Sequence, residues 1–159
     1  MSKDYDPRMH TAEHVLNRTM IRLFGCGRCF SSHLNAGKSK CDYRFFRPLS
    51  DAEGHALQDA VNTILWKNLP VVEQNVPRSE AEALVDLGKL PASVGPDDPI
   101  RIVTVGEYDI CPCIGAHVAN TADVGMFRLV SHEFKSAADG GEGGVLRIRF
   151  KLEEPLCAA

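Results

Sequence analysis

Two pairs of potential metal ligands stand far apart in this 159-residue chain. His10 and His14 lie four residues apart in a segment expected to be helical, so both imidazoles project from one face about a turn apart. Cys113 and His117 repeat this interval late in the chain. Thiolate sulfur and imidazole nitrogen are ligands that Zn²⁺ prefers, and four of them complete a tetrahedron. The pattern predicts one zinc site built from His10, His14, Cys113 and His117.

Two further interpretations of these residue types stay open. A CxxC and a CxC motif can together form a site of four thiolates: Cys26-Gly27-Arg28-Cys29 and Cys111-Pro112-Cys113. The run from His10 to His14 also matches the H-x-x-E-H motif of inverted zinc proteases, where Glu13 would be the general base. That class needs a further glutamate ligand and a larger body around the substrate.

The composition is that of a globular protein. The length corresponds to one domain, and 44% hydrophobic with 25% charged residues is the usual balance of a soluble fold. We therefore expect residues 1–159 to form a single domain. No apolar run is long enough to cross a membrane, and the first residues lack the apolar core of a signal peptide. The expected location is cytoplasmic, where thiols stay reduced and bind metals or pack in cores.

The elements that must position the ligands follow from periodicity and capping residues. Asp6 and Pro7 mark the start of a first helix, which Gly25 stops. Ser50 followed by Glu53 predicts a capping box on a second helix. Helices are predicted at 7–24, 51–67 and 79–87, and strands at 29–34, 41–46, 70–73, 100–105, 108–111, 126–134 and 145–152. Hairpins instead of βαβ units favour an α+β fold, an antiparallel or mixed sheet with packed helices.

The order of the motifs resembles the editing domain (second additional domain) shared by alanyl- and threonyl-tRNA synthetases, and most of all its free-standing versions, called AlaX. Further segments are similar in the same order: Tyr43-Arg44-Phe45-Phe46-Arg47-Pro48-Leu49-Ser50, Val61-Asn62-Thr63-Ile64, Asn68-Leu69-Pro70-Val71 and Val118-Ala119-Asn120-Thr121-Ala122-Asp123-Val124-Gly125. The chain departs from the family's pattern at Ile114-Gly115-Ala116, where Gly-Gly-Thr is usual, and at Ala122, where Gly is usual.

The resemblance implies an activity, the hydrolysis of the ester that joins a wrong amino acid to tRNA. Seryl- or glycyl-tRNA for alanine would be the substrate, Zn²⁺ the cofactor and mischarged tRNA the partner, and ATP is not expected. Zinc can activate water or polarise the ester carbonyl. Because four protein ligands would close the coordination sphere, we expect His10 or His117 to be displaceable and to act as the catalytic base. Cys113 is the expected anchor.

Selection of the amino acid is expected from the strand after the first helix. Strict alternation would put Cys29, Ser31 and His33 on one face, with Phe30, Ser32 and Leu34 on the other. A small polar side chain on the face toward the zinc can bond the hydroxyl of serine, which alanine lacks. A site built around such a bond discriminates far more strongly than one that senses a methylene.

Contact with tRNA is expected at two basic sets. Lys38 and Lys40 flank a hairpin turn, while Arg147, Arg149 and Lys151 alternate along the last strand. The net charge of −3 argues against a strongly basic protein, so phosphate contact would depend on a local patch. From a different class, a non-catalytic, zinc-stabilised RNA-binding module is the alternative function.

Overall fold

The computed structural model describes residues 6–85, 95, 97–137 and 143–154. In this part of the chain the helices are α1 (Pro7–Phe24), α2 (Asp51–Trp66) and α3 (Arg78–Leu84), with a 3₁₀ turn η1 (Thr121–Val124). The strands are β1 (Ser31–His33), β2 (Ser39–Phe45), β3 (Val71–Val76), β4 (Ile100–Val105), β5 (Asp109–Pro112), β6 (Met126–Ser136) and β7 (Gly144–Glu153). The expected α+β fold is confirmed.

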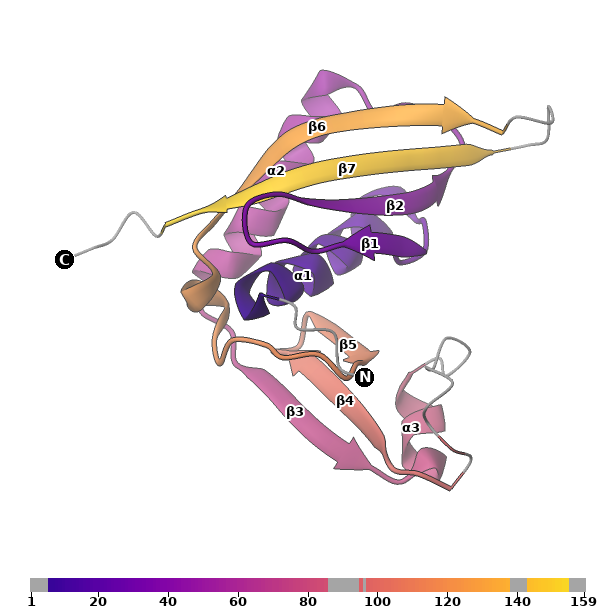
Figure 1. Cartoon of the computed structure of the whole chain (residues 1–159), viewed down its shortest axis with the longest axis vertical. Helices are drawn as coiled ribbons and strands as arrows, with labels where there is room; N and C mark the ends of the chain where they lie inside the picture. The colour runs from indigo at the N-terminus through magenta and orange to yellow at the C-terminus, as the bar shows by residue number, and fades with distance from the viewer. Residues whose placement is uncertain (1–5, 86–94, 96, 138–142, 155–159) are drawn as a thin grey trace.

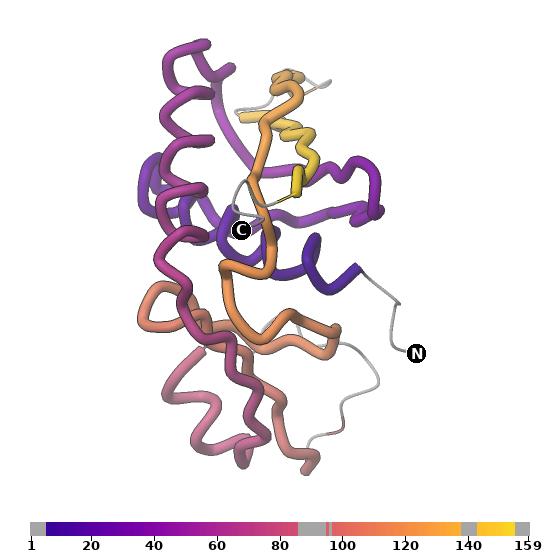
Figure 2. The backbone as a smooth tube through the Cα atoms, turned by 90° about the vertical axis from the view of Figure 1, so that its left-hand side faces the viewer, coloured from indigo at the N-terminus to yellow at the C-terminus, as the bar shows by residue number. Residues whose placement is uncertain are grey.

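The strands form two separate antiparallel sheets. One has the order β1-β2-β7-β6, and the other has the order β3-β4-β5. The first sheet lies in the upper half of Figure 1 with α1 and α2 behind it, and the second lies below α1. Figure 2 shows the same division from the side, where the chain after α2 descends into the smaller sheet and returns toward β6. Helix α1 is therefore the element common to both halves.

Helix α1 begins and ends as its capping residues predict. The Asp6 carboxylate accepts hydrogen bonds from the backbone N–H groups of Arg8 and Met9, and Gly25 adopts a left-handed φ of 70° after the last turn. Residues 9–17 are all buried, although they cover every face of the helix. A helix buried on all sides must be enclosed by other elements. Its polar residues, among them His10 and His14, consequently face other parts of the protein.

Helix α2 covers the four-stranded sheet. The predicted capping box forms, since Ser50 and Glu53 each accept a hydrogen bond from the other's backbone N–H. Buried Asn62 donates to the Phe127 carbonyl and accepts from its N–H, both at 2.8 Å, which ties α2 to β6. Helical spacing predicts core packing for Trp66, and this is wrong because the side chain stands at the end of the helix with 64% of its surface exposed.

The return segment between the sheets is held at Thr121. Its hydroxyl donates to the Leu65 carbonyl at 3.0 Å and accepts from the Leu69 N–H at 2.8 Å. Gly125 then turns the chain into β6 with a φ of 95°, and a Cβ there would stand 2.3 Å from the Glu153 carbonyl oxygen. These contacts fix the segment that follows β5 against the end of α2 and the end of β7.

Some expected boundaries differ from those of the structure. Helix α3 ends at Leu84, within the predicted 79–87, and its N-cap Pro77 offers no side-chain hydrogen bond. Most of the predicted loop at 88–99 and of the turn at 137–144, together with Cys157, falls outside the described residues. No helix in the described ranges is both long and apolar enough to span a membrane.

Candidate metal centre

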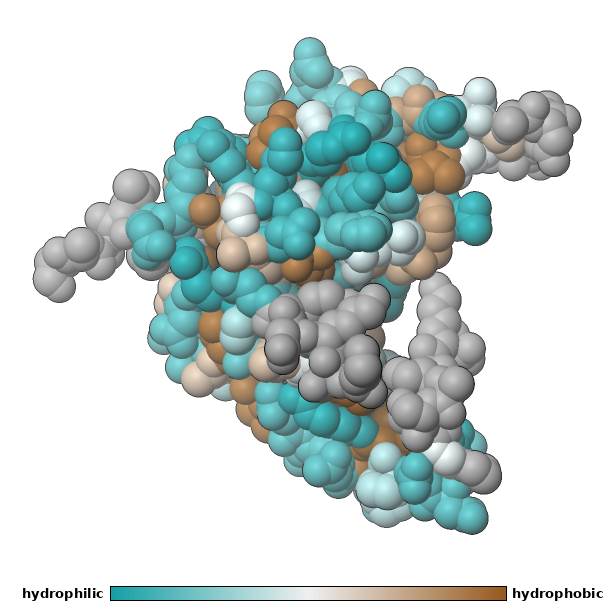
Figure 3. Space-filling view, viewed as in Figure 1, coloured by the Kyte–Doolittle hydropathy of each residue, from teal (hydrophilic) through white to brown (hydrophobic). Residues whose placement is uncertain are grey.

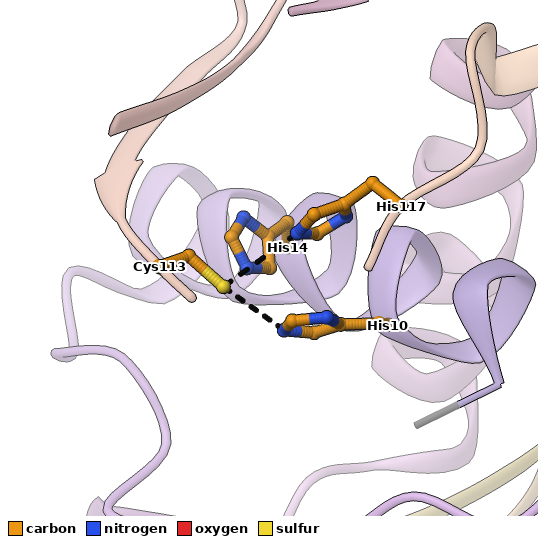
Figure 4. A group of neighbouring side chains, drawn as sticks. All are labelled: His10, His14, Cys113 and His117. Carbon is orange, nitrogen blue, oxygen red and sulfur yellow. Dashed lines mark hydrogen bonds between the residues drawn. The ribbon is translucent and has the colours of Figure 1, made fainter. Parts of the chain in front are cut away.

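The four predicted ligands converge on one point. Imidazoles from the first turns of α1 meet Cys113 and His117, which follow β5, and every ligating atom lies within 4.8 Å of the others. The Cys113 Sγ is 3.2 Å from His10 Nε2 and 3.6 Å from His117 Nε2 (Figure 4). His10 and His14 are almost fully buried, and the other two are half-buried. The sequence separated these side chains, and the fold brings them together.

The spacing and the donor set fit a tetrahedral cation. With zinc–sulfur bonds of ~2.3 Å and zinc–nitrogen bonds of ~2.0–2.1 Å, a tetrahedron puts sulfur and nitrogen about 3.6 Å apart. The Cys113–His117 separation equals this value, and the Cys113–His10 separation is slightly shorter. The group can therefore hold a metal ion with small adjustments of its side chains.

The Nδ1 atoms of His10 and His117 are each held by a group from the other half of the cluster. His10 Nδ1 lies 3.1 Å from the carbonyl of Ala116, the neighbour of His117. His117 Nδ1 lies 3.0 Å from the hydroxyl of Thr11, the neighbour of His10. The same hydroxyl accepts the Val118 N–H at 3.2 Å. Each half of the cluster thus orients a ring of the other half, as second partners of metal-bound histidines do.

His14 faces a buried carboxylate. Its Nδ1 lies 3.6 Å from the Asp109 carboxylate, longer than a hydrogen bond, and makes no hydrogen bond to any residue that the structure describes. Asp109 itself is held by Arg18 at 2.9 Å and by a bidentate pair with Arg28 at 2.8 and 3.1 Å. The carboxylate is therefore fixed beside His14 by cations from α1 and from the segment before β1.

Burial keeps the three imidazoles neutral. It lowers the pKa of His10 from 6.5 to about 4 and, with His10 and Arg101 nearby, that of His117 to about 3. The pKa of fully buried His14 falls well below 6.5 for the same main reason. Burial also raises the pKa of the Cys113 thiol. Neutral imidazoles are the form that binds metals, and a bound cation would favour the thiolate.

A cavity of about 730 Å³ adjoins the cluster. His10, His14 and Cys113 line it, and so do Cys29 and Ser31 from the predicted substrate-binding set. The space is large enough to take an aminoacyl group, so ligands and cavity form one candidate site.

The expected alternation is present from Ser31 to Leu34, where Ser31 and His33 are exposed and Ser32 and Leu34 are more buried, but it does not extend back to Cys29 and Phe30. The regular strand begins only at Ser31, after a bend at Phe30. Ser32 pairs with buried Cys41 and so lies on the inner face of the sheet, where it lines the cavity together with Glu13. Ser31 and His33 are exposed, and His33 borders a second cavity instead. The bend at Phe30 interrupts the alternation, so that Phe30 and Ser31 are both exposed. Alternation alone does not predict this bend.

The four-thiolate arrangement does not form. Among the described residues, Cys113 groups with the three histidines, whereas Cys29 groups with Glu13 and Cys41. Glu13 therefore groups with two cysteines and not with His10 and His14, as the general base of a peptidase would.

The predicted basic residues gather on the outer face of the four-stranded sheet. Lys38, Lys40 and Arg149 surround the second cavity with His33. Arg149 is paired with Glu133, and Arg147 makes a bidentate pair with Asp42 at 2.8 and 2.9 Å. Lys151 is exposed further along β7. This face is mostly hydrophilic in the upper half of Figure 3.

Several supporting residues were not foreseen from the sequence. Thr11 and Asp109 carry no motif, and their partners lie about a hundred positions away. For Thr11 the sequence offers one signal, a threonine within the pattern of an amphipathic helix. For Asp109 it offers none.

Comparisons with known proteins relate this chain to tRNA synthetases. Residues 100–149 match the sequence profile of the threonyl and alanyl tRNA synthetase second additional domain. The chain is 33% identical over 129 residues to an alanine–tRNA ligase of Listeria monocytogenes, which covers 77% of this chain. An alanine–tRNA ligase of Streptococcus thermophilus is 30% identical over 125 residues, or 78% of the chain. The chain spans about 14% of the length of these curated relatives.

The fold and the comparisons define the class. The chain carries a domain of the threonyl and alanyl tRNA synthetase second additional domain family, and the resemblance noted in its motifs is confirmed.

Proposed function

We propose that this protein hydrolyses the ester of mischarged aminoacyl-tRNA, with seryl- or glycyl-tRNA for alanine as substrate. The observation that carries the proposal is the three-histidine, one-cysteine cluster at the edge of a cavity, within a domain related to alanine–tRNA ligases. The proposed cofactor is Zn²⁺, held by His10, His14, Cys113 and His117. When bound, it would supply a Lewis acid that polarises a carbonyl and lowers the pKa of water.

The residues around the cation would divide the work. Cys113 is fixed on both sides of its peptide group, because its N–H donates to the Arg101 carbonyl at 3.1 Å and its carbonyl accepts from the Arg101 guanidinium at 2.7 Å. We assign it the anchoring role. His117 is the most exposed of the three imidazoles and comes from a loop. Of the two candidate bases, it is the one better placed to leave the metal and take a proton from water.

Discrimination between amino acids would occur in the cavity. Cys29, Ser31 and Ser32 line it, together with the Glu13 carboxylate. A hydroxyl on the substrate can exchange hydrogen bonds with this polar wall, whereas a methyl group cannot. We therefore expect seryl-tRNA to be hydrolysed faster than alanyl-tRNA.

The tRNA would reach the site along the outer sheet face. Lys38, Lys40 and Lys151 make no ion pair in the described part of the chain, and Arg149 adds a further cation at the second cavity. Such cations bind phosphates by releasing counterions.

The direct test is loss of the ester from seryl-, glycyl- and alanyl-tRNA, followed with metal analysis of the same preparation. We expect turnover of seryl- or glycyl-tRNA with one zinc bound at the cluster. Cys113→Ala should lose the metal of this cluster and the activity together, while Cys111→Ala, a half-buried thiol two residues away, should keep both. Full activity in Cys113→Ala with no metal at this cluster would overturn the mechanism.

Tight binding of tRNA with zinc present and no ester loss would instead indicate the non-catalytic RNA-binding module. The closed set of four protein ligands is the observation that favours this second function, since structural zinc sites have no open position.

A further inference from the structure

A second group of ligating side chains lies beside the candidate metal centre. The Glu13 carboxylate and the thiols of Cys29 and Cys41 have ligating atoms within 4.8 Å of one another. They come from α1, from the segment before β1 and from β2. Cys41 is completely buried, Glu13 is 9% exposed, and Cys29 lines the 730 Å³ cavity. Neither the proposed hydrolysis nor the first cluster uses these three groups together.

The other half-buried thiols near the cavity are engaged differently. Cys26 donates to the Met20 carbonyl at 3.6 Å, and Cys111 donates to the Pro112 carbonyl at 3.3 Å. The thiols of Cys29 and Cys41 instead lie within 4.8 Å of each other. A pair of adjacent thiols with a carboxylate at their side is a donor set for thiophilic divalent cations.

We propose that Glu13, Cys29 and Cys41 form a second metal site, which binds a thiophilic divalent cation such as Zn²⁺ or Cd²⁺. A tetrahedral zinc site puts two sulfur atoms about 3.8 Å apart, so side-chain rotations that close about 1 Å suffice. Because Glu13 and Cys29 line the cavity, water or a small ligand from it could complete the coordination. Two thiolates and one carboxylate carry one negative charge more than a divalent cation neutralises. The guanidinium of Arg28, which lies near Glu13, offsets this remaining charge.

Cobalt(II) distinguishes the two sites, because its near-ultraviolet charge-transfer band arises only from thiolate ligands. The fully reduced protein is titrated with Co²⁺ and the bound metal is counted. We expect the protein to bind two equivalents, with one thiolate at the first site and two at the second. In Cys113→Ser the remaining band should be about twice as intense as the band of Cys29→Ser, since it reports two thiolates instead of one.

Cys111→Ser is the matched control, because this thiol lines the same cavity but belongs to neither group; it should keep both equivalents and the full band. Cys29 is preferred to buried Cys41 for the variant because its replacement disturbs the core less, and circular dichroism checks the fold. A Cys113→Ser protein without a thiolate band would overturn the proposal. An undiminished wild-type band in folded Cys29→Ser would do so as well, and both results are separate from success or failure of the hydrolase assay.

Discussion

Thr11 and His117 are joined by a hydrogen bond of 3.0 Å between hydroxyl oxygen and Nδ1, which connects the first turns of α1 to the loop after β5. With Nε2 directed at the Cys113 sulfur, a metal-bound His117 would carry its proton on Nδ1 and donate it to Thr11. The hydroxyl then fixes both the tautomer and the ring plane.

Thr11→Val should weaken metal binding by about 10–100-fold, because it removes this oxygen without changing the volume of the buried side chain. Competition with a chromophoric chelator measures the affinity. Thr11→Ser retains the oxygen and should stay close to wild type. Equal affinities for the valine and serine variants would mean that the bond has no orienting role.

Removal of the Asp109 charge should destabilise the fold. Asp109→Asn leaves the guanidinium groups of Arg18 and Arg28 without their buried partner, a change that costs about 3–5 kcal/mol in comparable buried pairs. Urea unfolding of the metal-free protein measures the difference. Asp42→Asn breaks a similar bidentate pair at a more exposed position and should cost clearly less. A loss for Asp109→Asn no greater than that control would contradict the argument.

Substitution should distinguish the two candidate bases, His10 and His117. His117→Asn should retain the metal on three ligands and lower the rate of ester hydrolysis by about 10²–10⁴-fold, the usual contribution of a general base. His10→Asn should lose the metal itself, since His10 belongs to the buried helical pair. Metal content and rate are measured on the same samples, and the reverse pattern would assign the base to His10.

Stability of the metal-free protein should fall as the pH decreases. The pKa of His10 is lowered from 6.5 to about 4 and that of His117 to about 3, so below pH 6.5 the unfolded chain takes up protons that the folded chain does not. Stability therefore rises with pH across the window between the folded and unfolded pKa values.

Urea midpoints at about pH 7 and pH 5, above the range in which carboxylates with lowered pKa contribute, should show the decline. His117→Gln should have a shallower pH dependence than wild type. Identical midpoints at the two pH values would show that the imidazoles are not buried in the neutral form.

Phosphate contact should appear in the salt dependence of tRNA binding. Lys40→Ala should lower affinity and reduce the slope of log K against log salt by about one. Lys67→Ala, an exposed lysine at the end of α2, is the control and should leave the slope unchanged. If both variants behave alike, tRNA does not bind across the outer sheet face.

Local signals predicted the parts of this fold that depend on neighbouring residues. The caps at Asp6 and Ser50 involve partners within three positions, and both form as expected. The bend at Phe30 depends instead on a partner in β2, since the Phe30 N–H donates to the Asp42 carbonyl at 2.9 Å. The exposure of Trp66 depends on what packs around the end of α2, which helical spacing does not reveal. Asp109 escaped notice because Arg28 and Arg18, which hold it, are 81 and 91 residues away.

The candidate site was easier to anticipate than its surroundings. His10 with His14, and Cys113 with His117, are each four residues apart, and the co-occurrence of two such pairs is the signal that favours a metal site. To predict which residues of β1 line the cavity, one must know the register of β1 against β2, which places Ser32 opposite Cys41. Hydrophobic periodicity carries no information on that register when a strand is only three residues long.

The distance along the chain between the two halves of the cluster sets the order in which the protein can be completed. His10 and Cys113 are 103 residues apart, so during synthesis the helix that carries the first imidazoles precedes the sulfur by roughly 5–20 s. A nascent chain cannot retain a cation through the full set of ligands until β5 has emerged and docked. Loading of the proposed zinc would thereby be a late event in biogenesis, and shortened translation products would leave the ribosome without it.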